Sequence, residues 1–156
     1  MRIMDFLDKK AVTVSLQGKD KKAVLEEMVD LLLKSGAMSP KEKNGILKVL
    51  MEREELGSTG IGQGIGIPHG KSTSVKELVA ALGIAKTGVD FESLDGEPVF
   101  IFFLLIAPAE SAGPHLKALA RISKLLKDKY FRDMLRNAPD EKTLVKIISD
   151  EDQKKQ

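Results

Sequence analysis

Hydrophobic positions near the start of the chain have the spacing of a strand followed by a helix. The β-branched stretch Ala11–Val14 predicts a short strand. Beyond it, apolar residues recur at helical spacing from Lys21 to Ser35, which predicts an amphipathic helix, and Gly36 is its expected end. The residues expected to face the core from this helix are Leu25, Met28, Val29 and Leu32.

A second helix is expected between Ser39 and Gly57. Ser39 has the position of an N-cap, Pro40 suits the first turn, and Glu42 is spaced to complete a capping box. The helical spacing continues through three apolar positions, Ile46, Val49 and Leu50. Arg53 therefore lies near the C-terminal end of this helix.

The middle of the chain alternates glycine with isoleucine and then becomes strongly apolar. Residues 57–70 read GSTGIGQGIGIPHG, which favours an extended backbone that another molecule can approach closely. Strands are expected at Leu78–Ala85 and Pro98–Ala107. The second of these is continuously apolar, so both of its faces should be covered and it should lie in the middle of a sheet.

A third helix is expected after Ser111–Pro114 and should run to about Lys127. Pro114 is compatible with its first turn, because the amides there have no intrahelical acceptor. This arrangement places His115 at the N-terminal edge of the helix. The residues predicted to face the core are Leu116, Leu119, Ala120 and Leu126.

Two shorter helices are expected at Tyr130–Asn137 and Glu141–Ser149, and residues 151–156 are expected to form a frayed tail. Helices before and after a strand-rich middle predict an α/β fold, an α+β sandwich with a mixed central β-sheet flanked by helices. The sequence has no internal repeat and no long Pro-, Gly- or Ser-rich linker. Residues 1–150 are therefore expected to form a single domain.

Composition narrows the classes of function. The chain has 25 Lys and Arg against 23 Asp and Glu, and 4% aromatic residues, which argues against nucleic-acid binding. It has no cysteine, which excludes disulfides, thiol nucleophiles and thiolate metal sites. Met1–Phe6 lacks the apolar stretch of a signal peptide, and Val99–Ala107 is too short to cross a bilayer. A cytoplasmic protein without direct membrane insertion is expected.

The glycine-rich segment does not have the glycine spacing of a nucleotide-binding loop. A dinucleotide fingerprint that starts at position 60, 62 or 64 would need glycine at position 65, 67 or 69, where the chain has isoleucine or histidine. A Walker A loop that ends at Ser72 would also need glycine at position 65, which is Ile65. No nucleotide is expected to bind here.

The chain has only two histidines, His69 and His115, and each follows a proline. Histidine suits reversible phosphoryl transfer, because the neutral imidazole is a nucleophile near neutral pH. Arg53 can bind phosphate oxygens in a bidentate manner, and glycine-rich backbone or helix-start amides can hold the remaining charge. These residues form a candidate phosphoryl site, although composition alone favours a turn or surface role for either histidine.

The residues from Arg53 to Gly70, REELGSTGIGQGIGIPHG, resemble the signature of the fructose, mannitol and nitrogen-regulatory enzyme IIA family of the bacterial phosphotransferase system. The resemblance continues in FESLDGEP at Phe91–Pro98, in the apolar strand before Pro108, and in the helix that follows Pro114. It spans nearly the whole chain. It implies the mannitol/fructose-type enzyme IIA fold and one EIIA type 2 domain over residues 1–150.

The resemblance also implies roles for individual residues. His69 would accept phosphate from a histidine phosphocarrier protein (HPr-like), while His115 and Arg53 would hold or stabilise the phosphoryl group. No cofactor and no metal would be required, because catalysis would consist of positioning and charge neutralisation. The further neighbours expected at the phosphate site are Ser58, Thr59 and Gly70.

Two versions of this function remain open. As a phosphotransferase of sugar transport, the chain would pass its phosphate to a IIB domain of a sugar permease of the fructose/mannitol class. Such IIB domains carry phosphate on cysteine, so the IIB domain would belong to another polypeptide. As a nitrogen-regulatory protein, the chain would control its binding to target proteins through its phosphorylation state. A plain small-molecule-binding or structural α/β domain would not be modified by the carrier at all.

Three positions depart from the family pattern. Phe100 occupies a position where nitrogen-type members often have aspartate, Gly66 replaces a usual alanine, and Pro114 immediately precedes His115. Phe100 argues against the nitrogen-regulatory type. Gly66 and Pro114 remove no reactive group, but each alters the stiffness of the backbone.

Overall fold

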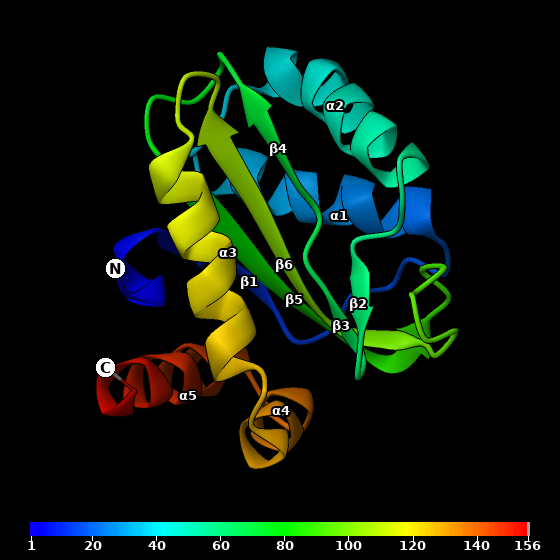
Figure 1. Ribbon diagram of the computed structural model, residues 1–156, viewed down its shortest axis with the longest axis vertical. Helices are drawn as coiled ribbons and strands as arrows, with labels where there is room; N and C mark the ends of the chain where they lie inside the picture. Colours follow the sequence, from blue (N-terminus) through cyan, green and yellow to red (C-terminus); the bar gives the residue numbers. More distant parts are fainter. Residues whose placement is uncertain (156) are drawn as a thin grey trace.

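A six-stranded mixed sheet forms the centre of the computed structural model, which describes residues 1–155 (Figure 1). The strands are β1 (Leu7–Thr13), β2 (Gly60–Gly62), β3 (Ile65–Gly66), β4 (His69–Ser72), β5 (Val79–Val89) and β6 (Val99–Pro108). The helices are η1 (Ile3–Asp5), α1 (Lys21–Lys34), η2 (Pro40–Glu42), α2 (Lys43–Glu55), α3 (Gly113–Leu125), α4 (Lys129–Arg136) and α5 (Glu141–Lys154). The predicted fold class, a mixed sheet flanked by helices, is confirmed.

The apolar strand β6 is the central strand of this sheet. The strand order is β1-β5-β6-β3-β2, and β4 also pairs with β6. Strand β5 is antiparallel to β6, whereas β3 and β4 both run parallel to it. Strand β1 is parallel to β5, and β2 is antiparallel to β3. The sheet therefore mixes both kinds of pairing, and β6 is covered along both of its edges.

Two apolar layers cover the two faces of the sheet, because successive side chains of a strand point to opposite faces. Ile101, Phe103 and Leu105 of β6 pack in a cluster with α3, α4 and α5. Phe102 and Leu104 pack on the other face with α1 and α2. Figure 1 shows the helices on either side of the strands. Burial of both faces was predicted from the continuous apolar run of β6 and is confirmed, and it explains why polar residues do not alternate with apolar ones in this strand.

The N-terminal elements occur in the predicted order with two corrections, the first being that β1 begins at Leu7 and not at Ala11. Helix α1 ends at Lys34, and Gly36 follows it with φ of 86°, a conformation that glycine adopts without strain. The predicted capping box before α2 is wrong. Ser39 makes no side-chain cap, residues Pro40–Glu42 form a short 3-10 turn, and α2 begins only at Lys43.

The predicted inward face of α3 is wrong at two of its four positions, while Leu119 is partly buried against the core as predicted. Leu116 is 65% exposed and Ala120 is exposed, whereas Leu126 is buried as predicted. The helix instead buries two polar side chains, His115 and Arg121, together with apolar ones. Both have neighbours beneath the helix: His115 packs against His69, and Arg121 pairs with Asp152 of α5. These polar contacts fix a rotation of α3 that counting apolar residues alone does not give.

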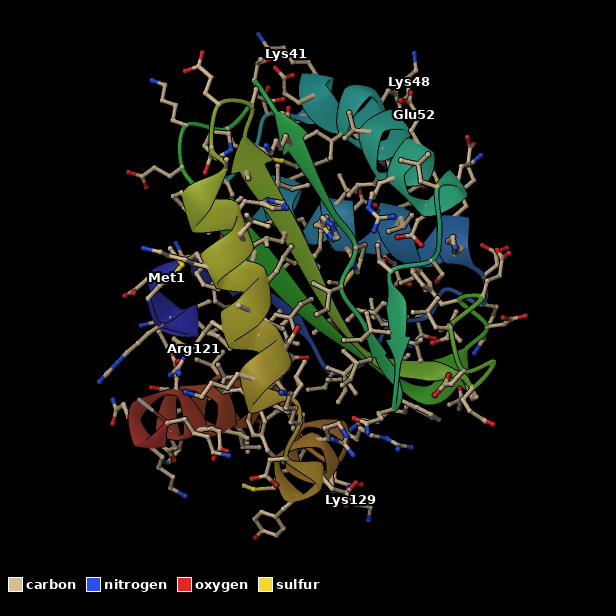
Figure 2. The ribbon with its side chains drawn as sticks, in the orientation of Figure 1. Met1, Lys41, Lys48, Glu52, Arg121 and Lys129 are labelled. Carbon is tan, nitrogen blue, oxygen red and sulfur yellow. The ribbon has the colours of Figure 1, made fainter. Side chains whose placement is uncertain are left out.

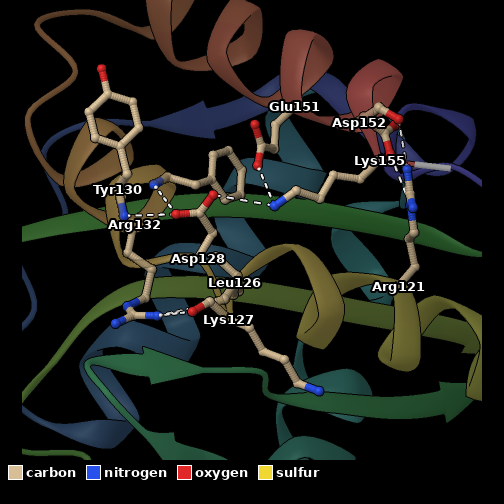
Figure 3. Close-up of polar contacts among 10 residues, drawn as sticks. Arg121, Leu126, Lys127, Asp128, Tyr130, Arg132, Glu151, Asp152 and Lys155 are labelled. Carbon is tan, nitrogen blue, oxygen red and sulfur yellow. Dashed lines mark hydrogen bonds and ion pairs between the residues drawn. The ribbon is translucent and has the colours of Figure 1, made fainter.

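The predicted frayed tail is corrected for residues 151–154, because α5 continues to Lys154. Asp152 is fully buried, and its Oδ1 accepts hydrogen bonds from Arg121 Nε at 3.1 Å and Nη2 at 2.8 Å (Figure 3). Its Oδ2 accepts a further bond from the amide of Met4 at 2.9 Å. One carboxylate thus joins α5, α3 and the N-terminal turn. Gln156 lies outside the described residues.

Within residues 1–155, no helix combines the length and the apolar character needed to cross a membrane.

Replacing Arg121 with methionine should lower the free energy of unfolding by roughly 3–5 kcal/mol, because the carboxylate of Asp152 would stay buried without its cation. Urea unfolding followed by circular dichroism measures this loss. The matched control is Lys146→Met, which removes an exposed pair with Asp150 on the surface of α5 and should change stability by less than about 0.5 kcal/mol. Equal effects of the two substitutions would contradict the structural role of the buried pair.

Candidate functional site

The position of His69 follows from an interruption in one strand of the sheet. Residues Ile65 and His69 pair with Ile101 and Leu105 of β6 in the same parallel register, so β3 and β4 are two parts of one extended path. Pro68 lies at the break and cannot donate to the ladder, although its carbonyl accepts from the Leu105 amide at 3.0 Å. His69 is the first residue after this break.

The ring of His69 is held in one tautomer by the same break. Its Nδ1 lies 2.7 Å from the carbonyl oxygen of Ile67. Because a carbonyl oxygen can only accept, Nδ1 carries the proton and donates, and Nε2 keeps its lone pair. The side chain is half-buried. Burial lowers the pKa of His69 below the ordinary value, and the nearby charge of Arg53 lowers it further, against an opposing effect of the Ile67 hydrogen bond.

The second histidine packs directly against the first. The ring centroids of His69 and His115 are 5.3 Å apart, and the rings are inclined by 58°. His115 lies in the first turn of α3, which begins without a side-chain cap at Ala112. Its Nδ1 is buried and has no hydrogen-bond partner among residues 1–155. Burial lowers the pKa of His115, and His69 and Lys71 lower it further.

Arg53 lies in the last turn of α2, and its guanidinium is tied to the following turn. Nη1 donates to the carbonyl of Gly57 at 2.9 Å. The next residue, Glu54, is buried and accepts from the amide of Thr59 at 3.0 Å, from the hydroxyl of Thr59 and from Lys21 Nζ, also at 3.0 Å. This buried carboxylate fixes the end of α2 to the glycine-rich segment, and thereby fixes the position of Arg53.

These residues meet in a cleft of 570 Å³ between α2, β4 and the start of α3. The cleft is lined by Val49, Glu52, Arg53, Glu55, Leu56, His69, Gly70, Lys71 and His115. Glycine at position 70 permits close packing, because a Cβ there would lie 2.8 Å from Val49 Cγ1. A cleft of 610 Å³ between Asp5–Asp8 and Ser74–Val79 is slightly larger but contains neither histidine. The candidate functional site is therefore the smaller cleft.

The structure brings together four of the six residues predicted for the site: His69, His115, Arg53 and Gly70. Ser58 and Thr59 do not line the cleft. The hydroxyl of Ser58 donates to the Phe91 carbonyl at 2.7 Å, and that of Thr59 donates to Glu54. Both hydroxyls hold the turn after α2, and their expected place beside a phosphate stays a prediction.

Sequence reasoning missed Lys71 as a residue of the cleft. Its signal was available, because residues two apart on a strand share a face and Lys71 follows His69 at that spacing. The complete arrangement offers a neutral nucleophilic nitrogen, a second imidazole and two cations around one opening. Such a site can receive an anionic phosphoryl group on histidine. Within residues 1–155, no cluster of three or more His, Cys, Asp or Glu side chains is placed to hold a metal ion.

Comparison with known sequences gives a consistent result. The family described as "Phosphoenolpyruvate-dependent sugar phosphotransferase system, EIIA 2" matches residues 5–151. The chain is 38% identical over 152 residues to the PTS system fructose-specific EIIABC component of Bacillus subtilis (strain 168), which covers 97% of this chain and only 24% of that protein. It is 35% identical over 149 residues to a nitrogen regulatory protein of Bradyrhizobium diazoefficiens, covering 96% of this chain and 95% of that protein.

Solved structures resemble the fold closely. The nitrogen regulatory protein IIA-Ntr of Neisseria meningitidis superimposes with a TM-score of 0.84 at 30% identity, covering 94% of this chain and 98% of that one. The IIA chain in a complex of enzyme IIAMTL and phosphorylated enzyme IIBMTL from Escherichia coli gives a TM-score of 0.76 at 14% identity, covering 93% and 99%. The second likeness concerns the fold alone.

The tautomer and the neutral state of the two histidines can be tested directly by nuclear magnetic resonance. In ¹H–¹⁵N spectra, His69 should show the Nδ1-protonated tautomer, and both histidines should titrate below the ordinary value of about 6.5 because burial disfavours the charged ring. The variants His69→Ala and His115→Ala assign the two signals. A midpoint at or above the ordinary value, or protonation of His69 on Nε2, would show that this description of the site is wrong.

Proposed function

We propose that this chain, which belongs to the EIIA 2 family of the phosphoenolpyruvate-dependent sugar phosphotransferase system, is a phosphocarrier that accepts a phosphoryl group on Nε2 of His69. Members of this family take part in phosphoryl transfer. The observation that carries the proposal is the hydrogen bond from Nδ1 to the Ile67 carbonyl, which leaves Nε2 unprotonated in the cleft. A lowered pKa keeps that nitrogen available near neutral pH.

The donor in this proposal is a histidine phosphocarrier protein (HPr-like). Its N–P bond breaks while a new N–P bond forms from the lone pair of His69 Nε2, and the donor nitrogen keeps the bonding electrons. The two nitrogens lie in line across the transferred group. Arg53 offsets the charge of the phosphoryl oxygens, and His115 packs beside the ring that receives it. Neither a metal nor a cofactor takes part in this step.

The acceptor we propose is the cysteine thiolate of a IIB domain, since none of the 156 residues is a cysteine that could take the phosphate itself. Exposed apolar side chains lie at the site: Leu56 is 85% exposed and lines the cleft, and Leu116, 65% exposed, follows His115. Apolar side chains around a reactive centre suit a small interface that releases its partner after transfer. The similar fold in a IIA–IIB mannitol complex supports this choice.

A second candidate is nitrogen-type regulation, in which the phosphorylation state changes the affinity for a target protein. Similarity supports it, because the chain is 35% identical to a nitrogen regulatory protein and superimposes on a IIA-Ntr structure with a TM-score of 0.84. Phosphorylation would place about two negative charges close to the exposed side chains of Leu56, which lines the cleft, and Leu116, which follows His115. A target that docks on those side chains would bind the two states differently.

Phosphate acceptance is tested by incubating the protein with phosphoenolpyruvate, enzyme I and the histidine phosphocarrier protein. Mass spectrometry should show a gain of one phosphate that is labile in acid and stable in base. His69→Ala should abolish the gain, because no nucleophile remains, whereas His115→Ala should keep a slower modification, on the order of 10–1,000-fold, since it removes a supporting group. A folded wild-type protein that stays unmodified would refute the phosphocarrier function.

The fate of the phosphate separates transport from regulation. A carrier for transport should pass its phosphate to the cysteine of a fructose-class IIB domain, and Leu56→Asp should slow that transfer by placing a charge in the apolar contact at the cleft. Leu94→Asp is the matched control, because Leu94 is 75% exposed and does not line the cleft. Stable phosphoprotein in the presence of IIB, combined with target binding that depends on phosphorylation, would favour the regulatory candidate.

A further inference from the structure

A lysine that the family signature did not single out lies beside the two histidines. Lys71 is two residues after His69 on β4, so the two side chains leave the same face of the strand. It is exposed and lines the cleft with His69, His115 and Arg53. Its charge acts on His115 strongly enough to contribute to that residue's lowered pKa. The ammonium group therefore lies within electrostatic range of the histidine pair.

Lys71 has no carboxylate partner that would neutralise it. No ion pair joins it to any carboxylate of residues 1–155. By contrast, Lys21 at the start of α1 forms ion pairs with Glu54 and Glu92. A lysine ammonium on a flexible stem has three donors and can turn toward an anion that arrives in the cleft.

The charges around the cleft are balanced only when no phosphoryl group is present. Arg53 and Lys71 contribute two positive charges, and the exposed Glu52 and Glu55 contribute two negative ones. The guanidinium of Arg53 is partly engaged, since its Nη1 donates to the Gly57 carbonyl. A phosphoryl group would add about two negative charges. Arg53 alone, which is partly engaged, would offset only part of that charge. Arg53 and Lys71 together supply two positive charges against it.

We propose that Lys71 is a second cationic phosphoryl-binding residue, which acts with Arg53 to stabilise the phosphorylated state of His69. Arg53 approaches from α2 and Lys71 from β4, so the phosphoryl oxygens are held from two directions. This inference rests on the proposed function, because it concerns the group that His69 would carry. It adds the prediction that Lys71, beyond His69, His115 and Arg53, affects the equilibrium constant for phosphate transfer to His69 as well as the rate of that transfer.

The test compares wild-type protein with Lys71→Met, Lys71→Arg and Lys129→Met. Lys129 is an exposed lysine of α4, on the far side of the molecule from α2 (Figure 2), so its variant controls for the loss of one charge. Each protein is equilibrated with phosphorylated histidine phosphocarrier protein, and the phosphorylated fractions are read from intact masses. At dilution, this equilibrium depends on the two phosphorylated states and not on how tightly the proteins dock.

The equilibrium constant for phosphate acceptance should fall about tenfold in Lys71→Met, as expected for loss of one charged contact at a partly exposed site. Lys71→Arg should retain most of the wild-type value, and Lys129→Met should equal it. Raising the salt concentration should reduce the difference between wild type and Lys71→Met, because ions screen the lost charge. A surface lysine with no role in the site would give the same constant in all four proteins, and that result would overturn the inference.

A second readout does not require phosphorylation. In the unmodified protein, Lys71→Met should raise the pKa of His115, because it removes a nearby positive charge. An unchanged His115 titration together with an unchanged equilibrium shows that Lys71 does not act on the site. If wild-type protein itself accepts no phosphate, the proposed function fails and the inference falls with it. If the wild-type protein is phosphorylated and Lys71→Met has the same equilibrium constant and the same His115 titration, the inference is overturned while the proposed function stands.

Discussion

The interruption of one strand at Pro68 is the constraint on which the site depends. The residues on either side of it remain in register with β6, so the sheet fixes where His69 lies. At the break, the carbonyl of Ile67 accepts from the histidine ring as a side-chain partner. A regular strand would direct its carbonyls to the neighbouring strand. The same local irregularity thus positions the nucleophile and selects which of its nitrogens is free.

Two buried carboxylates bring the remaining groups to this point. Glu54 joins the end of α2 to the turn at Thr59, and it thereby places Arg53 at the rim of the cleft. Asp152 joins α5 and the N-terminal turn to Arg121, which lies on the helix that carries His115. Neither carboxylate lines the cleft. Each is buried with charged or backbone partners, as buried carboxylates require, and each orients an element whose other residues form the site.

The regular elements could be predicted from the sequence because their signals are local. The apolar strand β6, helix α1 with Gly36 after it, and the pairing of His69 with Arg53 in one motif all follow from residue spacing or from the family signature. Burial on both faces leaves a continuous apolar run, and helical burial leaves a period of 3.6 residues.

The errors have a common physical cause, which is that polar partners distant in sequence cannot be seen in a local pattern. The rotation of α3 depends on Arg121 reaching Asp152, and the same contact makes the end of α5 helical instead of frayed. The hydroxyls of Ser58 and Thr59 bond to Phe91 and Glu54, and these partners are likewise not visible in the local pattern. Glycine at position 66 is explained only by the fold, since a Cβ there would lie 3.2 Å from Val99 Cγ1 and 3.3 Å from the ring of Phe102.

The positive charges in the cleft affect both the unmodified site and the proposed phosphorylated one. In the unmodified protein, burial and the nearby cations lower the pKa of both histidines, which keeps the rings neutral. A neutral ring is what a nucleophile needs, because a protonated nitrogen has no lone pair to give. Once a phosphoryl group is present, the same positive charges attract its oxygens. In the proposed phosphocarrier, the cations that favour the neutral nucleophile are therefore the same ones that would stabilise the phosphorylated product.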